Sequence, residues 1–335
     1  MKIFGKDTDN DLIFIAEIGV NHEGSLLKAK KMIALAAKAG ANAVKFQSYS
    51  TNRYVSVDDS IRQNRINNYL TSDKNLRILK QFAKKNNISI FSSALTEDKV
   101  KTLSKDFDVI KIASGDIDFK PTLIKAAKSG KKIILSTGCS DISDINNAIK
   151  VIKKYSKSKN LKNNLILMHC ISLYPTHLEH ANINSIKFIK NKFNLEVGYS
   201  NHVIEPEAIY AAVANGANII ELHFTDNKKR KFRDNHLSFT SKELEKIINI
   251  SKKIKLSLGE HNKKINKLEK KIKNSIRKGC AASKDLEKGH IIKSEDIMFT
   301  RNASYFSANE ISKLVGKKIK KSIKFNQIFK YANFK

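Results

Sequence analysis

Two lysines in this 335-residue chain lie within apolar segments, where a charged side chain is unusual. Lys45 interrupts the apolar run AVKF at 43–46, and Lys111 interrupts VIKI at 109–112. Placing an ammonium group in such a run is costly unless it faces a group that stabilises its charge. Hydroxyl-bearing residues stand at the ends of these and neighbouring runs. Together they predict a site for a small anion such as a phosphate or a carboxylate.

Two histidines, His202 and His223, stand at the ends of consecutive apolar runs, and Glu17 ends the first such run. Either histidine alone would be explained as a core residue. If the runs are neighbouring parallel strands, however, the two imidazoles converge. A pair of imidazoles with open positions suits a divalent metal that takes further oxygen ligands from substrate or water. The pair therefore predicts a metal site.

The elements that must position these residues repeat eight times in the first 225 residues. Each is a short β-branched run that ends in polar residues and is followed by a segment of helical periodicity. The runs are LIFIAEIG (12–19), NAVKFQ (42–47), ISIFSS (88–93), DVIKIAS (108–114), KIILST (132–137), NLILMHC (164–170), LEVGYS (195–200) and NIIELHFT (218–225). Near-continuous apolar strands alternating with helices indicate a parallel sheet covered on both faces, and eight units favour a TIM (β/α)8 barrel. A dinucleotide-binding fold is disfavoured because residues 19–24 lack GxGxxG spacing.

Helices are expected at 25–39, 73–86, 121–129, 143–154, 205–215 and 241–258, from periodicity and from capping residues at their ends. We predict three parts: a catalytic barrel at 1–258, a charged linker at 259–278 and a small β-rich domain at 279–335. Within the last part, LEKGHII (286–292) has a weak repeat in IKFNQIF (323–329), which indicates pseudo-twofold symmetry.

Composition excludes several classes of protein. The net charge of +31 invites a nucleic-acid interpretation, but only eight of the 63 basic residues are arginine, tryptophan is absent, and the lysines are scattered. We expect a solvated lysine-rich surface and no nucleic-acid partner. No apolar run approaches the ~18–20 residues of a membrane span, so no membrane association is expected. Three cysteines without a CxxC pair favour the reducing cytoplasm and argue against structural zinc.

These residues alone predict a cytoplasmic barrel enzyme that holds an anion on lysines and a carbonyl or hydroxyl on a metal. That combination fits carbon–carbon bond formation between an enol phosphate and a metal-polarised aldehyde.

Seven segments, in order, resemble the signatures of the sialic acid synthase family, which includes legionaminate and pseudaminate synthases. They are IAEIGVNHEGS (15–25), VKFQ (44–47), KIASGD (111–116), LSTG (135–138), HCISLYPT (169–176), GYSNH (198–202) and ELHFTD (221–226). The C-terminal segment is similar to the antifreeze-like (SAF) domain of that family. The resemblance spans nearly the whole chain.

The resemblance implies that phosphoenolpyruvate condenses with an N-acylated hexosamine, such as N-acetylmannosamine, to a nine-carbon 2-keto acid and phosphate. It implies that His202 and His223 hold Mn²⁺ or Mg²⁺, and that Glu17, Gln47 and Asp234 orient the sugar. It also implies that Arg301 of the small domain reaches the barrel of a partner subunit in a domain-swapped homodimer. The residues implied to bind phosphoenolpyruvate are Lys45, Ser93, Lys111, Ser114, Ser136, Ser172, Tyr174 and Ser200.

The chain departs from the family pattern at several of these positions. Asp116, which we count among the catalytic residues with Glu17 and the two histidines, stands where glutamate is common. Ser172 replaces a frequent asparagine near the anion site, and Asn201 a frequent aspartate. Arg301 is followed by Asn302-Ala303-Ser304 instead of the usual Pro-Gly-x-Gly.

Three alternatives remain at this point. The first is a legionaminate or pseudaminate synthase that uses a diacetamido-trideoxyhexose. The second is a related barrel enzyme that condenses phosphoenolpyruvate with another aldose, which the antifreeze-like segment argues against. The third is a non-catalytic sugar- or nucleic-acid-binding protein, which would have no need of a metal facing an anion site.

Overall fold

The computed structural model describes residues 1–260 and 262–335, which form two compact units, Met1–Gly259 and Glu260–Lys335. The predicted linker at 259–278 includes residue 261, which lies outside the described residues. The three-part division of the chain stays a prediction. None of the described helices combines the length and apolar character that a membrane crossing requires.

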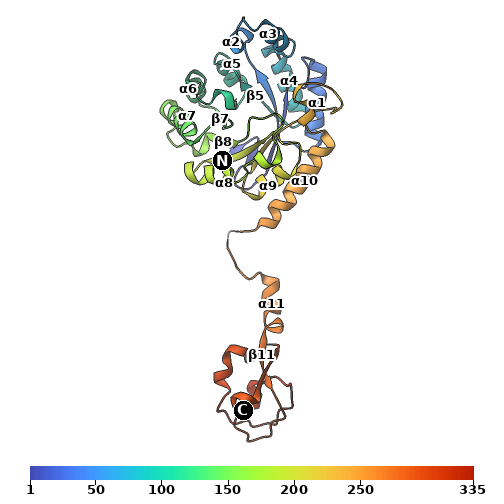
Figure 1. The fold of residues 1–335 in the computed structure, drawn as a ribbon, viewed down its shortest axis with the longest axis vertical. Coiled ribbons are helices and arrows are strands. Elements are labelled where there is room, and N and C mark those ends of the chain that lie inside the picture. The colour runs from blue at the N-terminus through green and yellow to red at the C-terminus, as the bar shows by residue number, and fades with distance from the viewer. Residues whose placement is uncertain (261) are drawn as a thin grey trace. The chain divides into compact units, whose positions relative to one another are not determined.

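The first unit is built around eight parallel strands that close into a barrel, with helices around it (Figure 1). The chain order is kept around the ring, and the last strand, β10, pairs with the first, β3. The predicted TIM barrel is confirmed. Its strands are β3 (Ile13–Gly19), β4 (Ala43–Ser48), β5 (Ser89–Ala94), β6 (Val109–Ile112), β7 (Lys132–Ser136), β8 (Leu165–His169), β9 (Glu196–Asn201) and β10 (Ile219–His223).

The barrel strands are apolar on both faces because the helices cover one face and the barrel interior the other. All seven residues of β3 are buried. The register of the strands brings charged residues together inside the ring: Glu17 pairs with Lys45 on one side and with His223 on the other. Polar residues at the carboxyl ends of different strands therefore meet at one rim.

The barrel helices include every one predicted and several more. Their amphipathic faces pack on the strands, and side-chain caps fix some of their ends; Ser25, for example, accepts a hydrogen bond from the amide of Lys28. Helices α2, α3, α5 and α8 were missed, because they are short. The bounds are α1 (Leu26–Lys38), α2 (Thr51–Tyr54), α3 (Ser60–Asn67), α4 (Asp73–Lys85), α5 (Lys99–Asp106), α6 (Lys120–Ser129), α7 (Ile142–Tyr155), α8 (Ser185–Phe193), α9 (Glu207–Ala214) and α10 (Ser241–Leu258). A short hairpin, β1 (Lys2–Ile3) and β2 (Lys6–Asp7), precedes the barrel.

The second unit has its own small core. Strands β11 (Lys278–Ala282) and β12 (Ile297–Arg301) pair antiparallel, and Leu286 forms a bridge with Ile323, so the two repeated segments contact each other. This small β-containing unit agrees with the predicted C-terminal domain. The same unit includes helix α11 (Lys267–Ile276), in the stretch that was predicted to be a linker.

Candidate active site

A pocket of about 370 Å³ opens at the carboxyl ends of the barrel strands. Its volume falls in the range typical of small-molecule sites. Most of the residues that the sequence analysis singled out line it, and they come from all eight strands and the loops that follow them. They are Glu17, Lys45, Gln47, Ser93, Lys111, Ser114, Ser136, Tyr174, Ser200, His202, His223 and Asp234.

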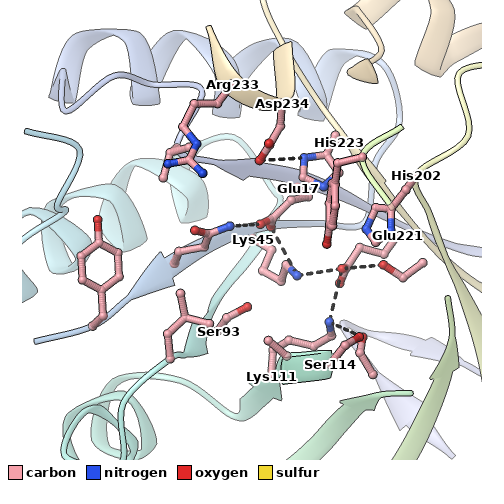
Figure 2. A pocket seen from close by; sticks show the side chains of 18 of the residues that line it. Glu17, Lys45, Ser93, Lys111, Ser114, His202, Glu221, His223, Arg233 and Asp234 are labelled. Carbon is pink, nitrogen blue, oxygen red and sulfur yellow. Dashed lines mark hydrogen bonds and ion pairs between the residues drawn. The ribbon is translucent and has the colours of Figure 1, made fainter. Parts of the chain in front are cut away.

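At the floor of the pocket, two buried lysines share one carboxylate oxygen (Figure 2). Oε1 of Glu221 lies 2.7 Å from Nζ of Lys45 and 3.3 Å from Nζ of Lys111. Ser200 donates a hydrogen bond to the same oxygen at 3.1 Å. Lys111 also donates to Ser136 Oγ at 2.8 Å. The predicted lysine pair therefore exists as a cluster with a carboxylate at its centre.

The protonation of this cluster follows from burial and from its charges. Burial alone would raise the pKa of Glu221, but Lys111 and Lys45 hold it well below its ordinary value. Burial likewise opposes the charge on Lys45, yet Glu17 and Glu221 raise the pKa of that lysine. Burial lowers the pKa of Lys111, with Glu221 acting against the shift. The lysines thus share a single firmly ionised carboxylate, Glu221.

Glu17 differs in character from Glu221. Burial raises the pKa of Glu17, although Lys45 acts in the opposite direction from 3.5 Å. Gln47 donates to its Oε1 at 3.1 Å, and its Oε2 has no hydrogen-bond partner. A carboxyl group that holds its proton more readily leaves the two lysines with surplus positive charge. It can also donate a hydrogen bond to an oxygen atom in the pocket.

Serines and a glycine form the wall beside Lys111. Ser114 Oγ accepts a hydrogen bond from the amide of Gly138 at 3.1 Å. A Cβ atom on Gly138 would lie 2.2 Å from Ser172 Oγ and 2.8 Å from Ser114 Oγ, so only glycine fits there. The amide of Gly138 thus fixes the hydroxyl of Ser114, while that of Ser136 is fixed by Lys111, and both serines line the pocket with Lys111, as an anion site requires.

The two predicted metal-binding histidines face each other across the pocket. Their ring centroids lie 5.5 Å apart, and the ring of Tyr174 packs at 4.1 Å from that of His202. Nδ1 of His202 lies 2.6 Å from the carbonyl oxygen of Ile171, which leaves Nε2 free to face the pocket. Burial lowers the pKa of both histidines to about 3, so both imidazoles are neutral at physiological pH.

These features fit a divalent metal. Neutral imidazoles are the form that binds metals, and the buried Nδ1 of His223 has no hydrogen-bond partner, with Asp234 Oδ2 at 3.8 Å. In residues 1–260 and 262–335, no group of three or more His, Cys, Asp or Glu side chains is arranged to hold a metal ion. The two histidines would therefore hold a metal whose other ligands are oxygen atoms of substrate and water.

Three of the predicted site residues do not line this pocket. Asp116 lies in a 3-10 turn two residues beyond Ser114, and burial raises its pKa to about 6. Ser172 lines the neighbouring pocket together with Cys139 and Phe188. Arg301 ends β12 in the second unit. The roles implied for these three residues stay predictions.

The sequence analysis missed Glu221 and the residues of the pocket mouth. Glu221 precedes His223 by two positions on β10, and residues two apart on a strand face the same side, so the pattern could have revealed it. The mouth residues were not predictable in this way, because they come from the short helices α2 and α3, from the 3-10 helix Arg233–Leu237 and from irregular segments. They are Tyr49, Tyr54, Arg62, Ile66, Tyr69, Leu95 and Arg233.

The chain is similar to known proteins over most of its length. N,N'-diacetyllegionaminic acid synthase of Campylobacter jejuni is 33% identical over 95% of this chain and 98% of its own length. N-acetylneuraminate-9-phosphate synthase of Drosophila melanogaster is 31% identical over 96% and 95% of the two chains. The crystal structure of N-acetylneuraminic acid (sialic acid) synthetase from Leptospira borgpetersenii, in complex with citrate, superposes with a TM-score of 0.74 at 34% identity. That superposition covers 78% of this chain and 90% of the other. Residues 32–263 match the NeuB family, and the chain belongs to that family.

Proposed function

We propose that this protein condenses phosphoenolpyruvate with an N-acylated hexosamine, forming a nine-carbon nonulosonic acid and phosphate. The observation that supports this most is one pocket holding two buried lysines with surplus positive charge at its floor and a neutral histidine pair above them. The names of the relatives point to the same reaction class, since they are synthases of legionaminic acid and of N-acetylneuraminate 9-phosphate.

The lysine end would bind phosphoenolpyruvate. Lys45 and Lys111 offer ammonium groups, and the hydroxyls of Ser93, Ser114, Ser136, Tyr174 and Ser200 offer hydrogen bonds to phosphate and carboxylate oxygens. Glu221 partly neutralises the two lysines, and the positive charge that remains would attract the phosphate and carboxylate of phosphoenolpyruvate.

The histidine end would bind the open-chain sugar through its aldehyde. A Mn²⁺ or Mg²⁺ ion held by His202 and His223 would supply Lewis acidity toward the aldehyde oxygen. Gln47 and Asp234 would orient the sugar hydroxyls, and Glu17 would donate a hydrogen bond from its carboxyl group. These groups would hold the aldehyde carbon above the anion site, within reach of C3 of phosphoenolpyruvate.

The reaction forms a carbon–carbon bond and breaks the carbon–oxygen bond to phosphate. C3 of phosphoenolpyruvate bonds to the aldehyde carbon, and the aldehyde oxygen takes up a proton. Water adds at C2 and gives up one proton, which balances the proton taken up by the aldehyde oxygen. The C2 hydroxyl then loses its proton as the C2–O bond to phosphate breaks, which leaves the 2-keto group and hydrogen phosphate. Asp116, whose raised pKa of about 6 still leaves it largely ionised at pH 7, is our candidate to accept a proton from that water.

The identity of the sugar stays open between two groups. N-acetylmannosamine or a close analogue is one, and the diacetamido-trideoxyhexoses used in legionaminate and pseudaminate synthesis are the other. The direct test measures the loss of phosphoenolpyruvate against a panel of acylated hexosamines, with mass spectrometry of the products. We expect one sugar to support turnover with a product that carries three additional carbons. If no sugar of the panel supported the consumption of phosphoenolpyruvate, the proposal would be contradicted.

We also propose that the protein works in the cytoplasm as a domain-swapped homodimer, with Arg301 completing the site of the partner. All three cysteines are free thiols, as in reducing compartments. Helix α11 exposes a row of apolar side chains, Leu268, Ile272 and Ile276, that are 74%, 51% and 55% exposed. Such a row is typical of a helix face covered by another chain.

Lys111→Met should raise the KM for phosphoenolpyruvate about 10- to 100-fold and leave the KM for the sugar within about threefold. The lost interactions are charge-assisted hydrogen bonds, each of which contributes roughly 1.5–3 kcal/mol. Methionine keeps the length of the side chain in its apolar surroundings. The control is Lys101→Met, on the exposed face of α5, which should change neither constant. Equal effects of Lys111→Met on both constants would contradict the anion role.

A further inference from the structure

A second cavity, of about 750 Å³, opens at the amino-terminal ends of three barrel strands. Its lining includes Ser89, Val109 and Lys132, which begin β5, β6 and β7. The N-terminal hairpin forms one wall, and residues 77, 80, 81 and 84 of α4 form another, since this spacing places them on one face of the helix. Among the residues that the structure describes, none lines both this cavity and the active-site pocket, which opens at the carboxyl ends of the strands. The two pockets are therefore separate sites on one barrel.

The floor of this cavity is apolar. Phe91 and Val109 are buried, and they precede by two positions on their strands the active-site residues Ser93 and Lys111. Residues two apart on a strand face the same side, so Phe91 and Val109 face the barrel interior below the active site. The ring of Phe4, in the hairpin, is only partly buried and packs on Phe91 at 5.0 Å between centroids. A flat apolar group that enters from the amino-terminal side would contact this aromatic surface.

The rim of the cavity is positively charged. Two carboxylates line it, and each is already paired with a cation. Asp106 Oδ2 lies 3.1 Å from Nε of Arg77, and Asp108 Oδ1 lies 3.0 Å from Nζ of Lys131. Within residues 1–260 and 262–335, the other cations of the lining form no ion pair with a carboxylate. They are Lys2, Lys80, Lys84 and Lys132. Four ammonium groups thus stand around the apolar floor without a counter-charge.

An unpaired lysine alone means little in this chain. Basic residues outnumber acidic ones by 63 to 32, so many lysines must lack a carboxylate partner. The position of these four distinguishes them, because lysine stems can cover apolar surface while their charges stay at the edge of a cavity. Nζ of Lys80, for example, lies 5.6 Å from the ring centroid of Phe107, which is a buried residue of the lining. The cavity therefore combines an apolar floor with a cationic rim.

We propose that this cavity binds a small organic anion, with an aromatic body against Phe4 and the floor and a negative group at Lys80 and Lys84. Small-molecule sites typically have volumes of roughly 300–1,000 Å³, apolar walls and a few polar groups that fix the orientation of the ligand. An inorganic anion would leave the apolar floor in contact with water, and an uncharged apolar molecule would leave the lysines without a counter-charge. The inference does not depend on the proposed condensation, because no residue of the active-site pocket takes part.

A fluorescence titration with 1-anilinonaphthalene-8-sulfonate, an aromatic anion that emits strongly in apolar surroundings, tests the proposal. We expect a saturable site for one molecule per chain, and saturating phosphoenolpyruvate should change its Kd by less than about twofold, because the two sites are separate. N-phenyl-1-naphthylamine, which has the same rings without the sulfonate, should bind at least about fivefold more weakly. In Lys80→Gln/Lys84→Gln the Kd of the sulfonate should rise at least about fivefold, whereas that of the amine should change by less than about twofold.

Lys74→Gln/Lys85→Gln is the matched control, because both lysines are exposed on α4 and neither lines the cavity. It removes the same charge and should leave the Kd of the sulfonate within about twofold of the wild-type value. Thermal unfolding shows whether each variant is folded. Absence of binding, displacement of the sulfonate by phosphoenolpyruvate, equal affinity for sulfonate and amine, or undiminished binding in folded Lys80→Gln/Lys84→Gln would each overturn the inference. A molar mass by light scattering that falls in Lys80→Gln/Lys84→Gln would also overturn it, since this face would then be an interface between copies of the chain.

Discussion

Glu221→Gln should lower the melting temperature of the ligand-free protein by on the order of 10 °C and enlarge the stabilisation that phosphoenolpyruvate provides. Removing one partner from a buried ion pair costs about 3–5 kcal/mol, because the remaining charge is left uncompensated. Here two buried lysines lose the only firmly ionised carboxylate they share. In a domain of this size, each kcal/mol shifts the melting temperature by about 2–4 °C.

Phosphoenolpyruvate should stabilise Glu221→Gln more than it stabilises the wild type. Phosphoenolpyruvate brings its own negative charges to the lysines, so the variant gains more from binding it than the wild type does. We therefore expect a larger rise in melting temperature with saturating phosphoenolpyruvate in Glu221→Gln. A variant that melts at the wild-type temperature, or that gains no more from the ligand, would show that Glu221 does not balance the lysines. Glu245→Gln, at an exposed position of α10, controls for the loss of a surface charge.

The contribution of Glu221 to the stability of the protein should decrease as the pH falls. Lys111 and Lys45 hold the pKa of Glu221 below its ordinary value of 4.5 against the effect of burial. A carboxyl group with a depressed pKa in the folded state contributes stability above its unfolded pKa and loses that contribution as the pH falls. The difference in stability between wild type and Glu221→Gln should shrink as the pH falls below about 4.5. Thermal unfolding at a series of pH values measures it.

The barrel was predictable because its strands carry a strong local pattern. Each one is a β-branched run bounded by polar residues, and parallel strands with two covered faces leave this pattern in the sequence. The same argument placed Lys45 and Lys111 in the interior, since a lysine within such a run has few other positions to occupy. The alternation on β10 places Glu221 on the same face as His223, but it does not show that Glu221 is the partner of the lysines. Glu221 lies on β10, far from either lysine in sequence, and only barrel closure brings it to them.

The mouth of the pocket was less accessible to sequence reasoning for a different reason. Helices α2 and α3 are short and polar. Their placement beside the pocket depends on tertiary contacts such as the packing of Tyr49 against Tyr54, which the sequence pattern does not show. Arg62 and Arg233 are 171 positions apart by their numbers, and no periodicity links them. Helix α11 was missed because its single row of apolar residues, Leu268, Ile272 and Ile276, stands among many lysines, and the segment was therefore interpreted as a charged linker.

His223→Ala should reduce metal-dependent turnover by at least about 1,000-fold, which corresponds to roughly 4 kcal/mol of transition-state stabilisation. The imidazole of His223 is buried, neutral and unpaired at Nδ1, and it faces His202 at 5.5 Å between ring centroids. Its loss leaves one imidazole in a site where the described residues offer no third ligand of the same kind. A titration with Mn²⁺, followed by calorimetry and by the rate of phosphoenolpyruvate loss, measures the affinity for the metal and the metal-dependent turnover.

Two controls distinguish a loss of metal binding in His223→Ala from a loss of folding. His223 is 7% exposed, so its truncation leaves a cavity, and the variant must first be shown to melt cooperatively and to bind phosphoenolpyruvate. The anion site lies on the lysines and does not depend on the histidines, so binding of phosphoenolpyruvate should persist when binding of Mn²⁺ is weakened. His180→Ala, at an exposed position at the end of a 3-10 helix, should change neither property. A folded His223→Ala protein that binds Mn²⁺ as tightly as the wild type and keeps its turnover would show that the imidazole pair does not hold the metal. The aldehyde would then have to be activated elsewhere in the pocket, with the carboxyl group of Glu17 as the nearest remaining hydrogen-bond donor to test.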